Sequence, residues 1–365
     1  MKYNKVPIFD LADWKNGLAF KQFAFSDNGK PIIKIAELKN GVSSQTSFTQ
    51  QEFDKSVYLT KGDLLFSWSG NPETSIDVFW YNLPDGWLNQ HIFKVTPKDG
   101  VNKVYLYYLL KYLKPEFTAI ASNKQTTGLG HVTVKDLKEL TVSLPDLEHQ
   151  TQIGKYLNMI DQVIRTNQKI NDNLEQQAQA IYSSMFIDSP NPAWKHGHLS
   201  DLITVKYGKD HKKLADGIYP VYGSGGIMRY AERPLYNKES VLIPRKGTLN
   251  NVIYVNQPFW SVDTMFYTEM KIPNVAKFVY HFVKAKDLAS MNAGSAVPSM
   301  TTDILNAMEV VIPSAPDLEE FESLVAPMYK AMEANHVQSQ VLSRMRDTLL
   351  PKLMSGEIDV SAVQL

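Results

Sequence analysis

The run Pro145-Asp146-Leu147-Glu148 occurs again as Pro316-Asp317-Leu318-Glu319, and each copy begins a polar, helix-like tract that ends on Ile-Asp. The two endings are Ile187-Asp188 and Ile358-Asp359, so the offset between the copies is 171 residues from the first proline to the last aspartate. Neither copy has gained or lost a residue over these 44 positions. A fixed offset of this kind indicates an internal repeat whose length is physically constrained.

Apolar side chains within the two copies recur every three or four residues, which is typical of one face of an α-helix. We expect helices over about 147–186 and 318–355, each with one buried stripe. Alternating apolar residues in 137–145 and 305–313 predict a short strand before each helix. The aligned stripe residues are Ile153 with Leu324, Leu157 with Met328, Ile170 with Val341, and Leu174 with Met345.

Capping and helix-breaking residues mark the ends of both helices. Asp146 and Asp317 each follow a proline and are the predicted N-caps, and Glu320 completes a capping-box pattern with Asp317. The prolines in 189–192 force the first helix to stop, since the residue before a proline avoids helical geometry. Pro327 should kink the second helix or delay its start.

A helix of about 40 residues is about 60 Å long at 1.5 Å per residue, so it cannot bury its stripe inside one small domain. Two such helices in one chain predict an antiparallel coiled coil. Asn167 and Asn171 interrupt the first stripe, so we do not expect a regular heptad zipper.

The blocks that precede the two helices also resemble each other. In each block an apolar strand runs into a glycine turn, and a tryptophan-led stretch and an aromatic-rich helical stretch follow. The matched ranges are 61–70 with 238–247, 87–93 with 260–266, and 104–113 with 275–283. The predicted fold is mixed α/β (α+β) with a pseudo-twofold internal repeat: block 1–145, helix 146–188, linker 189–193, block 194–316, helix 317–359 and tail 360–365.

The charge of the chain is balanced, with 38 basic and 38 acidic side chains, so the whole molecule has no long-range attraction for a polyanion. The balance differs locally. Residues 195–246 hold ten Lys or Arg against five Asp or Glu, whereas residues 301–365 hold four against ten. We therefore expect one basic surface and one acidic surface.

The chain has no cysteine, which excludes disulfides, thiolate zinc sites and cysteine nucleophiles. No apolar run approaches the roughly 18 residues of a membrane span and the start has no signal-peptide pattern, so we expect a soluble, cytoplasmic protein that does not contact a membrane. The eight histidines show no metal-ligand spacing, and no catalytic triad, Walker A loop or catalytic carboxylate pair is evident. We expect a protein that is not an enzyme and binds neither metal nor cofactor.

Two short strings resemble enzyme motifs. Asn191-Pro192-Ala193-Trp194 resembles the Asn-Pro-Pro-aromatic motif of amino-methyltransferases, but it lies in the linker, lacks the second proline and follows no strand. The stretch 222–226 resembles a nucleotide or methyl-donor loop, which needs a helix directly after it to bind the anion. Here the next stretch, 227–234, ends on a proline, so a tight turn is the preferred interpretation.

Loops rich in Gly, Ser, Thr, Asn and Gln, with Lys or Arg among them, occur at matching places in both blocks. They offer donors and acceptors for base edges and cations for phosphates, although most such loops taken singly are only solvated. Their recurrence favours DNA contact. The predicted contacts are Ser67, Ser69, Asn71, Lys124, Gln125, Thr126, Thr127 and His131 in the first block, and Lys209, His211, Lys212, Lys213, Tyr222, Ser224, Arg229, Arg245, Lys246, Thr248, Asn292 and Ser295 in the second.

Together these features resemble the specificity subunit of a type I restriction-modification system over nearly the whole chain. The resemblance rests on the strings 144–150, 89–92, 219–226 and 245–247. Two features depart from the family pattern. The second copy has Glu-Glu-Phe where Glu-x-Gln is usual, and the N-terminus lacks the usual Trp-x-x-Leu-Gly-Asp string, which leaves the start of the first block open.

The resemblance implies two target-recognition domains that each read one half of a split, asymmetric sequence in double-stranded DNA, separated by the antiparallel coil. It also implies that the coil docks two methyltransferase (modification) subunits, which carry the S-adenosylmethionine site, and that two ATP-driven restriction subunits join them. The chain itself would bind no cofactor. Two alternatives stay open: a stand-alone DNA amino-methyltransferase or endonuclease, and a coiled-coil scaffold without a nucleic-acid role.

Overall fold

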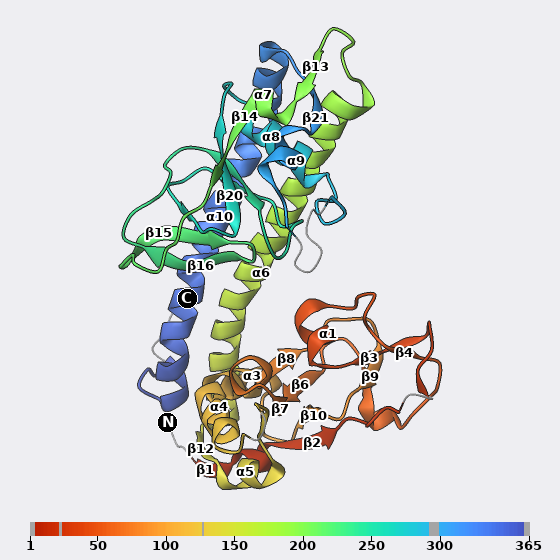
Figure 1. Cartoon of the computed structure of the whole chain (residues 1–365). Helices are drawn as coiled ribbons and strands as arrows, with labels where there is room; N and C mark the ends of the chain where they lie inside the picture. Colours follow the sequence, from red (N-terminus) through yellow and green to blue (C-terminus); the bar gives the residue numbers. More distant parts are fainter. Residues whose placement is uncertain (1–3, 22–23, 126–127, 292–298, 361–365) are drawn as a thin grey trace. The chain divides into compact units, whose positions relative to one another are not determined.

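The computed structural model describes residues 4–21, 24–125, 128–291 and 299–360. The chain divides into two compact units, the first formed by Met1–Thr166 with Val337–Leu365 and the second by Asn167–His336 (Figure 1). Each unit therefore holds one sequence block and half of each long helix. Within the described ranges, no helix combines the length and the apolar character that a membrane crossing requires.

The first unit is built on an antiparallel sheet in the order β2-β10-β6-β8, with a second sheet β4-β3-β9-β5 and the pairs β1-β12 and β7-β11. Its strands are β1 (Asn4–Pro7), β2 (Ala12–Asn16), β3 (Lys30–Ile33), β4 (Phe48–Thr49), β5 (Tyr58–Leu59), β6 (Leu64–Ser67), β7 (Ser69–Gly70), β8 (Asp77–Trp80), β9 (Gly86–Leu88), β10 (Ile92–Pro97), β11 (Gly130–His131) and β12 (Thr141–Leu144). Its short helices are η1 (Ile8–Leu11), α1 (Ile35–Asn40), η3 (Lys55–Val57), α2 (Pro72–Ser75), α3 (Lys103–Tyr112), α4 (Lys114–Asn123) and α5 (Val134–Glu139).

The second unit has an antiparallel sheet in the order β14-β20-β17-β18, a sheet β16-β15-β19 and the pair β13-β21. Its strands are β13 (Lys195–His198), β14 (Ile203–Tyr207), β15 (Asp216–Gly223), β16 (Gly226–Ala231), β17 (Ser240–Pro244), β18 (Ile253–Val255), β19 (Trp260–Ser261), β20 (Met265–Met270) and β21 (Glu309–Ile312). Its short helices are α7 (Leu199–Leu202), α8 (Ala276–Lys284) and α9 (Thr302–Asn306).

The strand order confirms the internal repeat of the blocks. The sheet β2-β10-β6-β8 corresponds strand for strand to β14-β20-β17-β18, and the pair β1-β12 corresponds to β13-β21. Each unit also has one parallel strand pair, in which Trp87 is opposite Ile32 and Trp260 is opposite Val221. The tryptophan-led stretches matched in sequence are therefore the same structural element in both units.

The long helices are α6 (Leu147–Ser183), which continues as a π-helix to Asp188, and α10 (Ala315–Ser355). Asp146 caps α6 as predicted, because its carboxylate accepts the backbone N–H of His149 at 3.0 Å. The prediction for Asp317 is wrong: α10 begins at Ala315, and the Asp317 carboxylate lies in its first turn, where it accepts hydrogen bonds from Ser314 and from the Trp194 indole.

Pro327 does not delay the start of α10, which was one of its two predicted effects. The helix begins at Ala315 and runs through Pro327 to Ser355. A proline removes the hydrogen bond to the carbonyl four residues earlier. That carbonyl belongs to Ser323, which is exposed, so water can replace the lost donor, while Phe321 and Val325 hold this part of the helix in the core.

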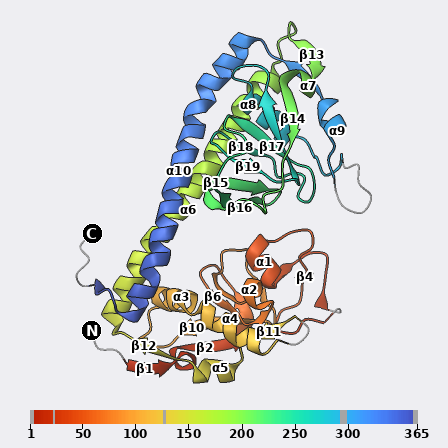
Figure 2. The same cartoon turned by 60° about the vertical axis from the view of Figure 1, so that its left-hand side comes forward.

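The two long helices pair antiparallel within each unit (Figures 1 and 2). In the first unit the Arg346 guanidinium binds the Asp161 carboxylate at 2.7 Å. In the second unit the Asn171 amide donates to the Met332 carbonyl at 3.0 Å and accepts from the Asn335 amide at 2.8 Å. The asparagines that interrupt the apolar stripe therefore form cross-helix hydrogen bonds, and the predicted coil is confirmed.

The predicted buried stripe is only partly correct. Ile153 and Leu157 are fully buried, but Ile170, Leu324, Val341 and Met345 are 43–56% exposed. Periodicity identifies an apolar face on a helix, but it does not show whether that face is covered within the same chain. Half of the predicted stripe lies on a surface that this chain leaves open.

Each unit connects its aromatic-rich helix to both long helices through a buried polar link. In the first unit, Tyr108 on α3 donates to Asp161 at 2.6 Å, and Asp161 also binds Arg346. In the second unit, His281 on α8 contacts Gln179 of α6 at 2.8 Å through Nδ1 and the Tyr329 hydroxyl of α10 at 2.9 Å through Nε2. A neutral imidazole satisfies both contacts, because one ring nitrogen donates and the other accepts.

We predict that His281 makes the second unit sensitive to acid. Burial lowers the pKa of His281 from 6.5 to about 4, so the unfolded chain takes up this proton at a higher pH than the folded chain. The stabilisation is complete above pH 6.5 and is lost as the pH falls toward 4. Thermal unfolding followed from pH 8 to pH 4 should show a steeper loss for the wild type than for His281→Gln. Parallel pH profiles would contradict this role of His281.

Candidate nucleic-acid interface

The two units share one backbone arrangement at the end of the central strand, β6 in the first and β17 in the second. The residue after each strand donates its N–H to one neighbouring segment and offers its carbonyl to another. The bonds are Trp68 N to His91 O (3.2 Å) and Val132 N to Trp68 O (2.8 Å) in the first unit, and Arg245 N to Thr264 O (2.8 Å) and Met300 N to Arg245 O (2.9 Å) in the second. Trp68 and Arg245 are therefore structurally equivalent.

A glycine at the end of the edge strand completes this arrangement in both units. A Cβ atom on Gly17 would lie 2.2 Å from the Asn89 carbonyl oxygen, and one on Gly208 would lie 2.0 Å from the Val262 carbonyl oxygen. Only glycine permits so close a backbone approach. This approach places Asn16, which precedes Gly17, beside Trp68, and Tyr207, which precedes Gly208, beside Arg245.

These contacts involve two residues that the sequence analysis missed, Asn16 and Tyr207. The Trp68 indole donates to the Asn16 side-chain oxygen at 2.9 Å. At the equivalent place, the Arg245 guanidinium lies 5.4 Å from the centre of the Tyr207 ring, a cation–π contact. The glycine that follows each residue, Gly17 or Gly208, was the one sequence feature that could have indicated a close backbone approach at this place.

A second segment joins each site. Ser69 pairs with His131 in the short β7-β11 ladder, and Lys246 forms an isolated antiparallel bridge with Ser299. We call this arrangement the paired-loop site. It comprises Asn16, Trp68, Ser69, His91 and His131 in the first unit, and Tyr207, Arg245, Lys246, Thr264 and Ser299 in the second.

The same backbone presents different side chains in the two units. In the first unit, the centre of the Trp68 ring lies 5.7 Å from that of Phe93, on which it stacks, and 5.8 Å from that of His91. Ser69 and His131 add a hydroxyl and a second imidazole to this site. In the second unit, Arg245 and the exposed Lys246 stand at this place. Lys209 also lies here, because it directly follows Gly208. One site is aromatic and largely uncharged, and the other is cationic.

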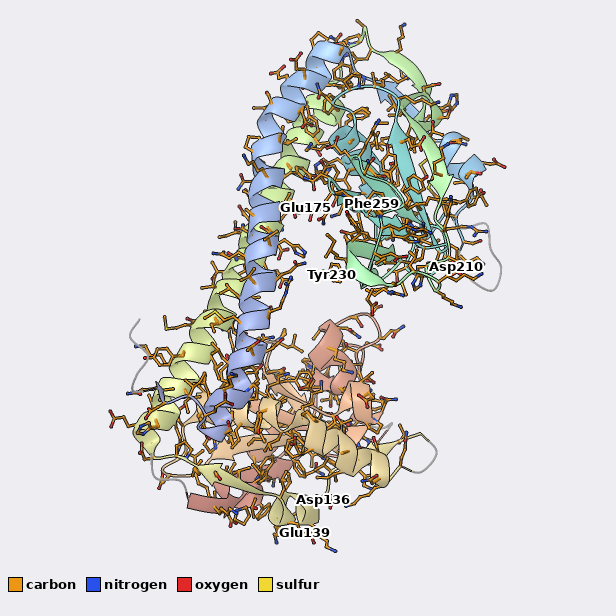
Figure 3. The ribbon with its side chains drawn as sticks, turned by 90° about the vertical axis from the view of Figure 1, so that its left-hand side faces the viewer. Asp136, Glu139, Glu175, Asp210, Tyr230 and Phe259 are labelled. Carbon is orange, nitrogen blue, oxygen red and sulfur yellow. The ribbon has the colours of Figure 1, made fainter. Side chains whose placement is uncertain are left out.

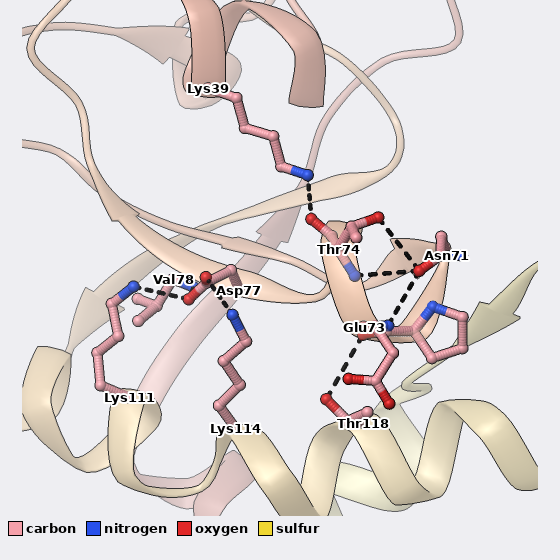
Figure 4. Close-up of polar contacts among 10 residues, drawn as sticks. Lys39, Asn71, Glu73, Thr74, Asp77, Val78, Lys111, Lys114 and Thr118 are labelled. Atoms are coloured by element: carbon pink, nitrogen blue, oxygen red, sulfur yellow. Dashed lines mark hydrogen bonds and ion pairs between the residues drawn. The ribbon is translucent and has the colours of Figure 1, made fainter. Parts of the chain in front are cut away.

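Several predicted residues of the first unit have internal roles. Ser67 is fully buried. The Asn71 side chain caps α2 by accepting the backbone N–H groups of Glu73 at 3.1 Å and Thr74 at 3.0 Å (Figure 4). Lys124 forms an ion pair with Asp136. Ser69 and His131 lie in the paired-loop site, Gln125 is exposed, and Thr126 and Thr127 lie outside the described residues.

Lysines beside this cap are also engaged within the unit. Lys111 and Lys114 each bind the Asp77 carboxylate at 2.7 Å (Figure 4). Burial alone would raise the pKa of Asp77, but the two ammonium groups lower it below its ordinary value. Lys39 donates to the Thr74 carbonyl. Lys111 and Lys114 are partly neutralised by Asp77, so they are weaker candidates for phosphate contacts.

Two predicted residues of the second unit also make internal contacts. The Arg229 guanidinium binds the Leu214 carbonyl and the Asp216 carboxylate, each at 2.9 Å, and so holds the β15-β16 hairpin. Tyr222 is 7% exposed and its ring contacts Phe259. Burial raises the pKa of Tyr222 to about 12, which keeps the phenol neutral. Both DNA contacts remain predictions.

Other predicted residues of the second unit gather near the paired-loop site. The Ser224 hydroxyl lies 2.7 Å from the position of a Cβ on Gly247, which places the hairpin tip beside Lys246 and Thr248. Lys212 and Lys213 are exposed on the loop that follows Lys209, and His211 on this loop is half-buried. Asn292 and Ser295 lie outside the described residues.

Acidic side chains of the second unit are engaged in contacts within the unit. Glu175 on α6 accepts hydrogen bonds from Tyr280 and Lys284, so its carboxylate faces α8 in the same unit (Figure 3). Across the parts of the chain that the structure describes, no three His, Asp or Glu side chains converge in a way that could hold a metal ion.

Comparisons with known proteins agree with this architecture. The family described as "Type I restriction modification DNA specificity domain" matches residues 1–176 and 191–324. The type I restriction enzyme MjaIX specificity subunit of Methanocaldococcus jannaschii is 26% identical over 83% of this chain and 84% of its own length. The HindI specificity subunit of Haemophilus influenzae is 20% identical over 82% of this chain and 87% of its own length.

A solved structure has the same fold. The S subunit of a type I restriction-modification system from M. genitalium superposes with a TM-score of 0.62 at 19% identity, and the match covers 97% of this chain and 96% of that chain. The family match extends over well more than half of the residues and includes both sequence blocks. The chain therefore belongs to the family of type I restriction-modification DNA specificity subunits.

Proposed function

We propose that each unit reads one half of a bipartite, asymmetric target in double-stranded DNA through its paired-loop site. The observation that carries the proposal is the shared hydrogen-bond pattern around Trp68 and Arg245, on which the two units display different side chains. A fixed backbone positions the readers, and the side chains that differ select the bases. Two unlike half-sites follow directly from this arrangement.

The second unit supplies the more electrostatic half of the recognition. Arg245 matches the paired acceptors of guanine in the major groove, and its contact with Tyr207 limits the directions that the guanidinium can take. Lys246 and Lys209 are suited to phosphates. In the first unit, Ser69 and His131 offer hydrogen-bond donors and acceptors, and Trp68 offers an aromatic surface.

The long helices set the distance between the two half-sites in this proposal, and they dock the partners. The relatives are named as subunits of type I restriction enzymes, so we propose that two methyltransferase subunits and the restriction subunits assemble on this chain. The repeat supplies two related docking surfaces on one chain, as an internal twofold does. Methyl transfer and cleavage then belong to those partners, and this chain chooses the sequence.

We predict that Arg245→Ala combined with Lys246→Ala weakens DNA binding about tenfold or more, because a base contact and a phosphate contact are lost, and lowers the slope of log affinity against log salt by about one, because only Lys246 is assigned to a phosphate. Fluorescence anisotropy with duplex DNA over a salt series measures both effects. Assembly with the methyltransferase subunit should be unchanged, since the paired-loop site is separate from the long helices.

Lys195→Ala is the matched control, because Lys195 is an exposed cation on β13 that pairs only with β21. It should leave the DNA affinity and the salt slope near the wild-type values. A double variant that binds DNA normally but no longer assembles with its partner would place Arg245 and Lys246 at a protein interface and would refute their role as readers.

We further predict that shortening both long helices by one heptad shortens the recognised spacer. Removing 163–169 and 334–340 keeps the Asp161–Arg346 and Asn171–Met332 contacts, and seven residues preserve the helix face. At 1.5 Å per residue, the loss is about 10 Å, or about three base pairs at 3.4 Å each. The methylated motif of cells with this variant should keep both half-sites. An unchanged spacer would rule out the helices as the ruler.

A further inference from the structure

The half of the coil in the first unit contains an apolar groove of about 360 Å³. Residues from both helices line it, and all of them are aliphatic or aromatic. They include Met159, Ile160 and Val163 from α6 and Leu342, Met345 and Leu349 from α10. An apolar groove between two helices is the usual seat of a third helix that carries an apolar face.

Exposed apolar residues extend this groove along both helices. Val337, Val341 and Met345 follow one another at intervals of four residues on α10, and Met159 and Val163 do so on α6. Each is 40–56% exposed. A spacing of four places side chains in a row along a helix, so the groove has a continuous apolar margin on each side. Met159, Val163 and Met345 also line the groove itself, so a helix seated in the groove would cover them.

The helix segments of the first unit are basic. Residues 147–166 and 337–355 carry five Lys or Arg against three Asp or Glu. Arg346 is paired with Asp161 and Asp347, and Lys352 with Glu357. Among the described residues, Lys155, Arg165 and Arg344 have no acidic partner. A helix that fits this groove therefore carries carboxylates beside its apolar stripe.

Two of the nine residues that line the groove have polar equivalents in the second unit, and several others have smaller apolar equivalents. At the offset of 171, Met159 corresponds to Lys330, Val163 to Ala334 and Leu342 to Asn171. The Asn171 side chain is already bound to the Met332 carbonyl. The charge is also reversed, since residues 167–183 and 315–336 carry two Lys or Arg against seven Asp or Glu. One partner helix cannot complement both halves of the coil equally.

We propose that the first unit is the tight docking site for one methyltransferase subunit, which inserts an acidic amphipathic helix into this groove. The second copy of the same subunit meets a more polar and acidic surface, so it binds more weakly and assembly proceeds in two unequal steps. This inference rests on the proposed docking of methyltransferase subunits. It adds an order in which the two methyltransferase subunits bind, whereas the pseudo-twofold repeat alone would predict two equal binding steps.

The test is a titration of the full-length chain with its cognate methyltransferase subunit, followed by native mass spectrometry and calorimetry. We expect a complex of one chain with one partner to form first, and the second step to be at least about tenfold weaker. Met159→Glu combined with Val341→Glu should remove the tight step. Both residues are substantially exposed, so circular dichroism should show an unchanged helix content.

The matched control is Lys330→Glu combined with Ile170→Glu, which changes the repeat-equivalent pair in the second unit. It should keep the tight step. Two equal steps in the wild type, or equal loss of the tight step in both double variants, would overturn the asymmetry. A chain that self-associates through this groove without the partner would overturn the assigned occupant. A wild-type chain that binds no methyltransferase subunit would refute the proposed function as well.

Discussion

The antiparallel pairing of α6 with α10 is the constraint on which the rest of the structure depends. Each unit contains half of both helices, so neither recognition block can complete its core from its own segment of sequence. Leu353 and Met354 of α10 enter the first core, and Ala178 and Tyr182 of α6 enter the second. Each core therefore depends on the pairing of α6 with α10, which is consistent with the equal length of the two copies of the repeat.

The paired-loop sites show how one backbone can serve two specificities. Their geometry is set by main-chain hydrogen bonds and by the close approaches at Gly17 and Gly208, none of which depends on the neighbouring side chains. Trp68 and Arg245 can therefore differ completely while they occupy the same structural position. In the proposed interface the side chains differ between the units, whereas the backbone frame that positions them is shared.

Sequence reasoning predicted the elements better than their surroundings. The repeat, the coil and the cap at Asp146 follow from local patterns and spacing, and the structure has all of them. The exposure of Val341 and Met345 depends on what else covers a helix face, which periodicity does not contain. The start of α10 was missed for a similar reason, because Ser314 and Trp194 engage Asp317 from outside the helix.

The candidate site was only partly accessible to sequence reasoning. The matched loops identified Ser69, His131 and Lys246 as candidates, but the pairing of Ser69 with His131 and of Lys246 with Ser299 was not predicted from the sequence. The contact between Tyr207 and Arg245 joins residues that are 38 positions apart, and no local motif marks it. Composition also could not reveal that Asn71 and Lys124 are engaged internally as a cap and an ion pair.

The most direct test of the central claim is a genome-wide map of methylated bases in cells with and without this chain. Two different readers held on one coil predict a bipartite motif, with two unlike half-sites and a fixed spacer, that is methylated only when the chain is present. A methylation pattern that does not change when the chain is removed, or the loss of a single continuous motif, would contradict the account.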